Sequence, residues 1–197
     1  MEIDKRQLES LLSLFSEAEA KVKEAEGIDG AISVPSINEL RYVGYHLTRA
    51  LANEDPREVE QELTKAANHA RRAIYYASEA QIIFLLEKVK DFHVRDRQSA
   101  SVTDVISDYL TLMECAEAAK QQIAATRSKN IPVDRPDYYQ LCQPHIDSLK
   151  KIVLRLELAE PEIYKKERQS ARNFMIAIAA LVATLLGVGI AVAQWIQ

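Results

Sequence analysis

The sequence predicts an all-α bundle followed by a single C-terminal transmembrane helix, and three observations lead to this fold class. Only five glycines and six prolines occur among the 197 residues, and helix-forming side chains dominate. Apolar residues recur at helical spacing through most of residues 1–170. The stretch 174–195, FMIAIAALVATLLGVGIAVAQW, carries no charge. We therefore divide the chain into a helical domain of about five helices, 1–170, and a transmembrane tail helix, 171–197.

The apolar stretch has the length that a membrane span requires. Its 22 residues would form a helix of about 33 Å, close to the roughly 30 Å of hydrocarbon in a bilayer. Thr184 and Gln194 are its only clearly polar members. Because only Ile196 and Gln197 follow it, we expect a tail anchor without a signal peptide. The alternative is a buried core helix.

Charged residues around the span predict its orientation. Four basic residues precede it and none follows: Lys165, Lys166, Arg168 and Arg172. Basic residues stay on the cytoplasmic side of a membrane, so we expect a single-pass protein of the inner (cell) membrane with residues 1–170 in the cytoplasm. Trp195 fits the aromatic belt at the far interface.

Composition argues against several functional classes. The net charge of −4 is too small and too mixed to favour nucleic-acid binding by bulk electrostatics. Cys115 and Cys142 have no metal-site spacing and no disulfide framework, so we expect buried thiols in a reducing compartment. Phosphate-binding loops, zinc motifs and nucleophile elbows are also missing from the sequence. We expect neither a metal nor a cofactor.

The first two helices are predicted from periodicity and end signals. A helix over 4–26 carries apolar residues at helical spacing, and Gly27 and Gly30 end it. Ser36 and Glu39 match a capping box that opens a second helix. The apolar stripe of that helix is Ile37, Leu40, Gly44, Leu47 and Leu51.

A long third helix is predicted from Pro56 to about His93, with proline at its first position. Its stripe repeats every three or four residues: Val59, Leu63, Ala66, Ala70, Ala73, Ala77, Ala80 and Phe84. Alanine in such a seam permits close approach of a neighbouring helix. We expect Gly44 of the second helix to face it.

Two further helices complete the predicted bundle. Ser101 to Asp104 caps a fourth helix that runs to about Arg127. Prolines at 132 and 136 mark a loop. A fifth helix begins near Asp137, and Pro161 should kink or break it before the chain continues as a helix into the membrane.

One short motif carries chemistry. Arg41 and His46 form an R-x4-H pattern, RYVGYH. Arginine binds phosphate through two hydrogen bonds, and histidine titrates near neutral pH. The motif resembles the ribonuclease signature of the HEPN superfamily, whose small all-α domains dimerise. The resemblance implies that Arg41 positions a phosphate and that His46 takes part in proton chemistry or leaving-group stabilisation.

The geometry of a regular helix leaves a second interpretation open. Arg41 and His46 would point about 140° apart. They converge only through a distortion near Gly44 or across an oligomer interface. Otherwise they lie at the edges of a packed helix. The chain also has Tyr42 where the HEPN family commonly places a polar residue.

A second cluster, on the third helix, combines basic and aromatic side chains: Arg71, Arg72, Tyr75 and Tyr76. We expect these residues to lie largely off the alanine seam. Arginine and tyrosine could bind a nucleotide, RNA or another subunit. The alternative is a solvated face with partners such as Glu79.

Small residues recur every fourth position in the membrane segment: Ala179, Ala183, Gly187 and Ala191. Such a face permits helices to pack closely in lipid. A single apolar helix cannot line a water pathway, so a pore would require several copies.

The combination of an R-x4-H motif, a small helical domain and one transmembrane helix resembles bacterial antiviral effectors, in particular the membrane accessory proteins of RNA-targeting CRISPR nucleases. This resemblance implies an oligomeric effector in antiphage defence that perturbs the membrane or forms a pore, without enzymatic activity. Its partners would be the lipid bilayer, further copies of itself, and RNA, a nucleotide signal or a CRISPR effector protein. The alternatives are a membrane-tethered, metal-independent HEPN ribonuclease and a non-enzymatic scaffold that recruits a partner to the membrane.

Overall fold

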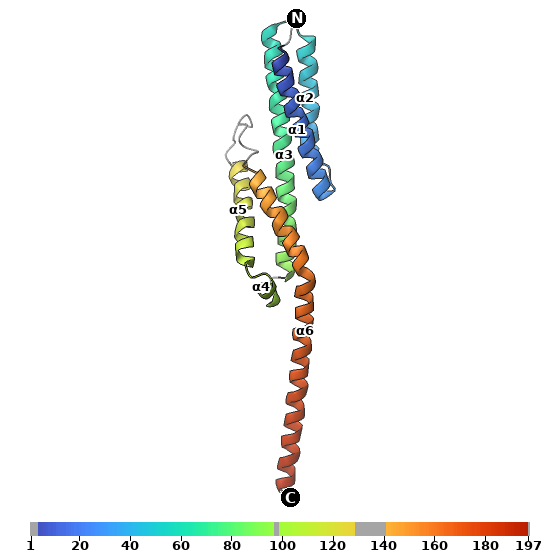
Figure 1. Ribbon diagram of the computed structural model, residues 1–197, viewed down its shortest axis with the longest axis vertical. Coiled ribbons are helices and arrows are strands. Elements are labelled where there is room, and N and C mark those ends of the chain that lie inside the picture. The colour runs from blue at the N-terminus through green and yellow to red at the C-terminus, as the bar shows by residue number, and fades with distance from the viewer. Residues whose placement is uncertain (1–3, 97–98, 129–140, 197) are drawn as a thin grey trace.

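The computed structural model describes residues 4–96, 99–128 and 141–196. In these residues every regular element is a helix, which confirms the predicted all-α class. The elements are α1 (Lys5–Asp29), α2 (Val34–Ala52), α3 (Pro56–Asp96), α4 (Ser101–Val105), α5 (Tyr109–Ser128) and α6 (Gln143–Ile196). Figure 1 shows a rod in which α6 extends far beyond the other helices.

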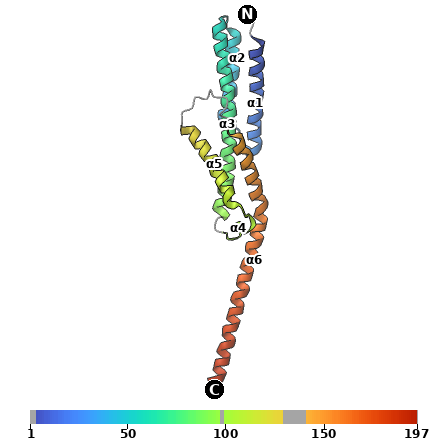
Figure 2. The same cartoon turned by 60° about the vertical axis from the view of Figure 1, so that its left-hand side comes forward.

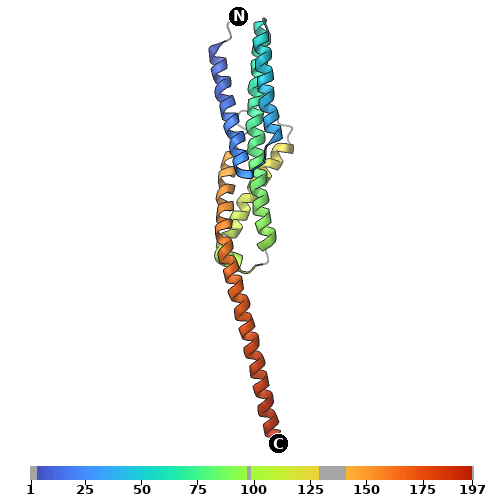
Figure 3. The same ribbon diagram turned by 90° about the vertical axis from the view of Figure 1, so that its right-hand side faces the viewer.

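Helix α3 is the axis of the bundle. Its 41 residues span about 60 Å. Pro56 starts it, and the Asp55 carboxylate accepts a hydrogen bond from the Arg57 backbone N–H at 2.9 Å, which satisfies one free donor of the first turn. Helices α1 and α2 pack on its first half, and α5 and α6 pack on its second half (Figures 1 and 3).

The alanine seam of α3 is confirmed along the half that α1 and α2 cover. The seam alanines Ala66, Ala70, Ala73 and Ala77 are completely buried there. The main apolar cluster of this half contains Leu11, Ala18, Val43, Ala50, Val59, Leu63, Ala66, Ala70, Ala73 and Ile74. Beyond Ala77 the buried face of α3 changes, because different helices cover it, and Ala80 and Phe84 are only half-buried.

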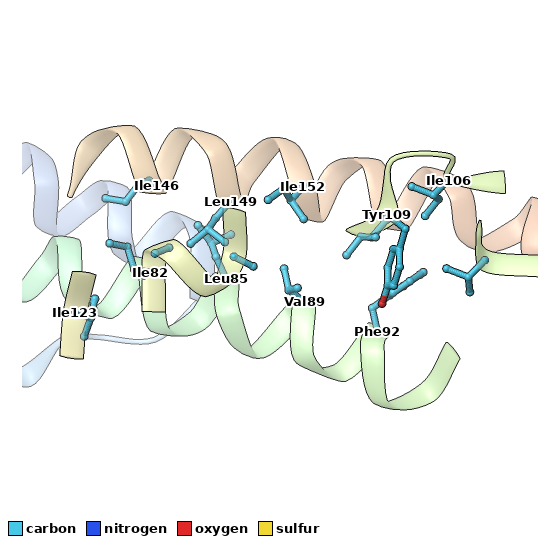
Figure 4. Close-up of a cluster of buried hydrophobic side chains, with 14 of the residues drawn as sticks. Ile82, Leu85, Val89, Phe92, Ile106, Tyr109, Ile123, Ile146, Leu149 and Ile152 are labelled. Carbon is cyan, nitrogen blue, oxygen red and sulfur yellow. The ribbon is translucent and has the colours of Figure 1, made fainter. Parts of the chain in front are cut away.

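The second half of α3 contributes to a larger apolar cluster with α4, α5 and α6. In Figure 4 its side chains Ile82, Leu85, Val89 and Phe92 lie opposite Ile146, Leu149 and Ile152 of α6. Ile82 and Leu149 are fully buried. This cluster holds the N-terminal part of α6, as far as Ile163, against the bundle. The C-terminal part of α6 lies outside the bundle.

The predicted start of α2 is wrong. The helix begins at Val34, and Ser36 lies inside it, with its hydroxyl hydrogen-bonded to the Ser33 hydroxyl at 2.7 Å. Pro35 is compatible with the first turn of a helix, so the helix starts before the predicted capping box. Glu39 therefore has no capping role and is available for another partner.

The predicted role of Gly44 is also wrong. This glycine is exposed, and a Cβ atom at its position would have no neighbour within 4 Å. The face of α2 that packs on α3 contains Ser36, Val43 and Ala50 instead. Helix α1 likewise continues through Gly27 and ends at Gly30, which has the left-handed φ of 69°.

The predicted fourth helix is two helices. Helix α4 ends at Val105, and the chain bends through Ile106, with φ of −115° and ψ of 87°, before α5 begins at Tyr109. The predicted cap at Ser101 is wrong as well, since Ala100 occupies the N-cap position. The bend turns the chain so that α5 runs back beside α3 (Figure 2).

Helix α6 joins the predicted fifth helix and the predicted span in one element of 54 residues. The expected start near Asp137 and the proline loop lie outside the described residues. Pro161 lies inside α6 and does not break it. The helix changes direction where it leaves the bundle (Figures 1 and 2), as expected when a proline removes one backbone hydrogen bond.

The C-terminal part of α6 is long and apolar enough to cross a membrane, and none of its most apolar 18 residues is buried. Residues 171–190 are all exposed. They pack against no other part of the described chain, so the alternative of a core helix of this chain is wrong.

Candidate functional site: paired histidines and carboxylates between α2 and α3

Two histidines and two glutamates form reciprocal pairs between α2 and α3. Nδ1 of His46 on α2 lies 2.6 Å from a carboxylate oxygen of Glu62 on α3. Nδ1 of His69 on α3 lies 2.6 Å from a carboxylate oxygen of Glu39 on α2. We call these four residues the His/Glu cluster.

The spacing of these residues explains the pairing. Glu39 and His46 form an E-x6-H pattern on α2, and Glu62 and His69 form the same pattern on α3. Seven residues are two helical turns, so each glutamate and histidine share one face of their helix. A short connection at 53–55 makes the helices antiparallel, so each histidine lies beside the glutamate of the other helix.

The two imidazole rings also contact each other and two tyrosines. The centroids of the His46 and His69 rings are 5.0 Å apart, and the planes differ by 15°. Tyr42 stacks on His69 at 5.1 Å, and Tyr45 meets His46 edge-on at 5.1 Å. Such ring contacts add to the stability of the two helices beyond the area that they bury.

Glu62 is the electrostatic centre of the cluster, with only 5% of its side chain exposed. Lys65 Nζ lies 2.7 Å from one carboxylate oxygen, and Arg49 Nε lies 3.7 Å from the other. The hydrogen bond from His46, followed by that from Lys65, lowers the pKa of Glu62 from 4.5 to about 2. Glu62 is therefore ionised at neutral pH and accepts these hydrogen bonds.

The structure separates the two residues of the R-x4-H motif. Arg41 is exposed, and its guanidinium carbon lies 5.4 Å from the centroid of the Tyr42 ring. In the described residues no hydrogen bond joins Arg41 to His46, whose Nδ1 is held by Glu62. Helix α2 is uninterrupted through Gly44, so no local distortion brings them together within one chain. Convergence across an oligomer interface stays a prediction.

The predicted binding cluster on α3 is half-buried along its length. Arg71 donates a hydrogen bond to Asn68 at 2.8 Å, and it lines a shallow groove of about 300 Å³ between α1 and α3. The Tyr75 hydroxyl donates to Glu79 at 3.1 Å, and its ring lies 5.3 Å from that of Tyr76. Arg72 Nε is buried without a hydrogen-bond partner among the described atoms. The four side chains therefore lie in more than one environment.

The two cysteines differ from each other. Cys142 is buried, as expected, and burial raises the pKa of its thiol to about 11. Cys115 is exposed, so the expectation of two buried thiols is wrong for this residue. Over the described residues no three histidine, cysteine, aspartate or glutamate side chains form a group that could hold a metal ion.

The small residues of the membrane segment are exposed on α6. Ala179, Ala183 and Gly187 face no other described residue, whereas the side chain of Ala191 lies outside the described set. The Thr184 hydroxyl donates to the Ala180 carbonyl at 2.9 Å. This bond satisfies the hydroxyl within its own helix, so Thr184 does not require a polar lumen.

Fold and site together define a rod-shaped helical protein with one exposed apolar helix and a histidine–carboxylate contact between α2 and α3. No family model, curated protein or solved structure matches the chain. The candidate function therefore rests on the geometry of the chain itself. In that geometry the His/Glu cluster joins α2 to α3, and α6 presents an exposed apolar surface long enough to cross a membrane.

Proposed function

We propose that this protein is anchored in the cell membrane by α6 and acts there as an oligomeric effector that perturbs the membrane. The observation that carries the proposal is the apolar surface of α6, which is exposed throughout residues 174–190. Fully burying one large apolar side chain contributes about 1.5–3 kcal/mol. A surface of this size is therefore unfavourable in water and favourable in the hydrocarbon of a bilayer.

Ion pairs along α6 support a mechanical link between the bundle and the span. Lys150 pairs with Glu24 of α1 at 2.7 Å, and Lys166 pairs with Asp104 of α4 at 3.0 Å. Helix α6 then continues without interruption into its apolar part. Association of the bundles of several copies would therefore bring their spans together.

The proposed defence role and partners rest on fewer observations than the membrane anchor does. Antiphage defence comes from the resemblance carried by Arg41 and His46, together with the membrane helix. On this proposal residues 1–170 lie in the cytoplasm, and the basic residues before the span support that orientation. RNA, a nucleotide signal or a CRISPR effector protein would act on the bundle, and further copies of the chain would act as partners within the membrane.

A membrane-tethered ribonuclease is the second candidate, and the contact between His46 and Glu62 favours it. A histidine with Nδ1 held by a carboxylate keeps Nε2 available for proton transfer, as a general base requires. Among the described residues Arg41 makes no hydrogen bond to His46, which supports the non-enzymatic proposal instead. A scaffold that recruits a partner would need only the anchor and the bundle surface.

Leakage from vesicles tests the proposal. Full-length protein would be reconstituted into vesicles that contain a self-quenching dye, and release would be compared with that from vesicles reconstituted with an unrelated single-span protein at equal density. We expect release that rises steeply with protein density, because several copies must associate. Stable incorporation with no dye release at any density would support membrane anchoring but contradict the effector activity. The scaffold alternative predicts this result.

A further inference from the structure

Three basic residues lie on one side of α6 immediately before its apolar part. Ile163 is 1% exposed and marks the side that faces the bundle. At about 100° per residue, Lys165, Arg168 and Arg172 lie roughly 200°, 140° and 180° around the helix from Ile163. They therefore form a strip that points away from the bundle, which we call the basic strip.

The other charges of this segment lie elsewhere on the helix. Lys166 is about 60° from Ile163, and its ammonium group pairs with Asp104 of α4 at 3.0 Å. Glu167 is about 40° from Ile163 and only partly exposed. The bundle side thus has no excess of positive charge, whereas the basic strip does.

The side chains of the basic strip are available to a ligand. Arg168 and Arg172 are exposed, and neither has an ion pair or a hydrogen bond with any residue that the structure describes. Lys165 is 73% exposed and makes one long contact of 3.5 Å with Glu162. Exposed ion pairs of this kind contribute little to stability.

The position of the strip along α6 indicates what it would bind. Relative to Phe174, Arg172 lies about 3 Å and Arg168 about 9 Å further toward the bundle, and Lys165 lies about 13 Å away. The headgroup layer extends roughly 5–8 Å beyond the hydrocarbon, and long basic side chains reach along the helix toward it. Arginine suits a phosphate group because its planar guanidinium donates two parallel hydrogen bonds.

We infer that Lys165, Arg168 and Arg172 bind the phosphate groups of anionic phospholipids at the surface of the membrane in which α6 is anchored. This inference rests on the proposed membrane anchoring and adds the lipid class that the anchor selects. Arg168 and Arg172 are the principal contacts, and Lys165 acts within a Debye length of the surface, about 10 Å at 0.1 M salt.

Lipid selectivity of the reconstituted full-length chain tests the inference. Vesicles of phosphatidylcholine would contain a trace of spin-labelled phosphatidylglycerol or of spin-labelled phosphatidylcholine, and the fraction of each label immobilised by the protein would be compared. We expect a severalfold preference for phosphatidylglycerol at low salt, since each basic residue near the surface contributes up to about a fivefold factor. The preference should weaken at high salt.

Variants assign the preference to residues. Arg168→Gln/Arg172→Gln should lose most of the preference, whereas Arg168→Lys/Arg172→Lys should keep part of it. Arg57→Gln/Lys151→Gln removes the same charge from exposed positions far from the span and should leave the preference unchanged. Lys166→Gln, at the same depth on the bundle side, should have a small effect.

The results that overturn the inference are distinct from failure of the anchor. Equal immobilisation of both labels by the wild-type chain, or a preference that survives Arg168→Gln/Arg172→Gln, would overturn lipid selection and leave the anchor in place. Recovery of the protein outside vesicles of either composition would overturn both the anchor and the inference.

Discussion

His46 and His69 stack their imidazole rings with centroids 5.0 Å apart, and each ring is held by a glutamate from the other's helix. Helices α2 and α3 are therefore joined by two hydrogen-bonded pairs as well as by apolar contact. Because the donors around Glu62 lower the pKa of its carboxyl group, the His46–Glu62 contact depends on pH. The His46–Glu62 contact therefore stabilises the packing of α2 on α3, and acid should weaken it.

Acid should weaken the bundle through Glu62. The pKa of Glu62 is about 2 in the folded chain and 4.5 in the reference state, so the unfolded chain binds the proton more readily. The contribution of Glu62 to stability is therefore complete above pH 4.5 and is lost as the pH falls toward 2. Thermal unfolding of the detergent-solubilised chain, followed by circular dichroism, measures this loss.

Glu62→Gln should flatten the acid dependence over the same pH window and lower the melting temperature at neutral pH. Glu60→Gln is the matched control, since Glu60 is an exposed glutamate on the same helix. It should keep the acid dependence of the wild-type chain. Identical pH profiles for the two variants would show that Glu62 does not carry the effect.

Two glycines should respond oppositely to alanine. Gly44 is in the interior of α2 with open space around it, so Gly44→Ala should stabilise the bundle by about 0.5–1 kcal/mol. Gly30 ends α1 with a φ of 69°, so Gly30→Ala should destabilise it by roughly 1–2 kcal/mol. Melting temperatures of the two variants check both signs. A loss of stability or of oligomers in Gly44→Ala would place a close partner at this position.

The sequence predicted the fold class and the seam of α3 because both depend on long, regular patterns. About seven turns of apolar repeat and a charge-free stretch outweigh local exceptions. Boundaries depend on shorter signals that compete. Ser36 and Glu39 match a cap, yet Pro35 permits an earlier start, and tertiary contacts give Glu39 a partner on α3.

The His/Glu cluster was missed because its pairs join different helices. The R-x4-H motif pairs His46 with Arg41, five positions away on the same helix. The relevant pattern was the repeated E-x6-H, which produces contacts only when α2 and α3 are aligned antiparallel. That alignment follows from the short connection at 53–55, so the repeated spacing and the short loop together could have indicated the cluster.

Variants of Arg41 and His46 should separate the structural role from catalysis. His46→Ala removes a donor from the buried Glu62 carboxylate, so it should lower the melting temperature of the bundle by several degrees. Arg41→Ala changes an exposed residue and should alter the stability by no more than about 0.5 kcal/mol. We expect no RNA degradation by the purified wild-type protein or by either variant. RNA cleavage by the wild-type chain that both variants abolish, with helicity intact, would establish the ribonuclease alternative.

The last prediction concerns the small-residue face of the span. Gly187 lies on the same side of α6 as Ala179 and Ala183, and a Cβ at this position would meet nothing within one chain. Because lipid offers no hydrophobic drive for helices to associate, close packing of small residues would hold the spans of several copies together. Gly187→Leu adds bulk to that face and preserves hydrophobicity, so it should still reach the membrane. We expect it to lose oligomers of the span, measured by cross-linking in vesicles, and with them dye release.

Gly189 supplies the matched control, since it lies about 200° further around the helix and has equally open surroundings. Gly189→Leu should retain both the oligomer and the release. If Gly187→Leu remains fully assembled and fully active, then the span is only an anchor, and the cytoplasmic bundle builds the oligomer. If both variants lose assembly, the spans associate through more than one face, because bulk on either side of α6 would then prevent close approach.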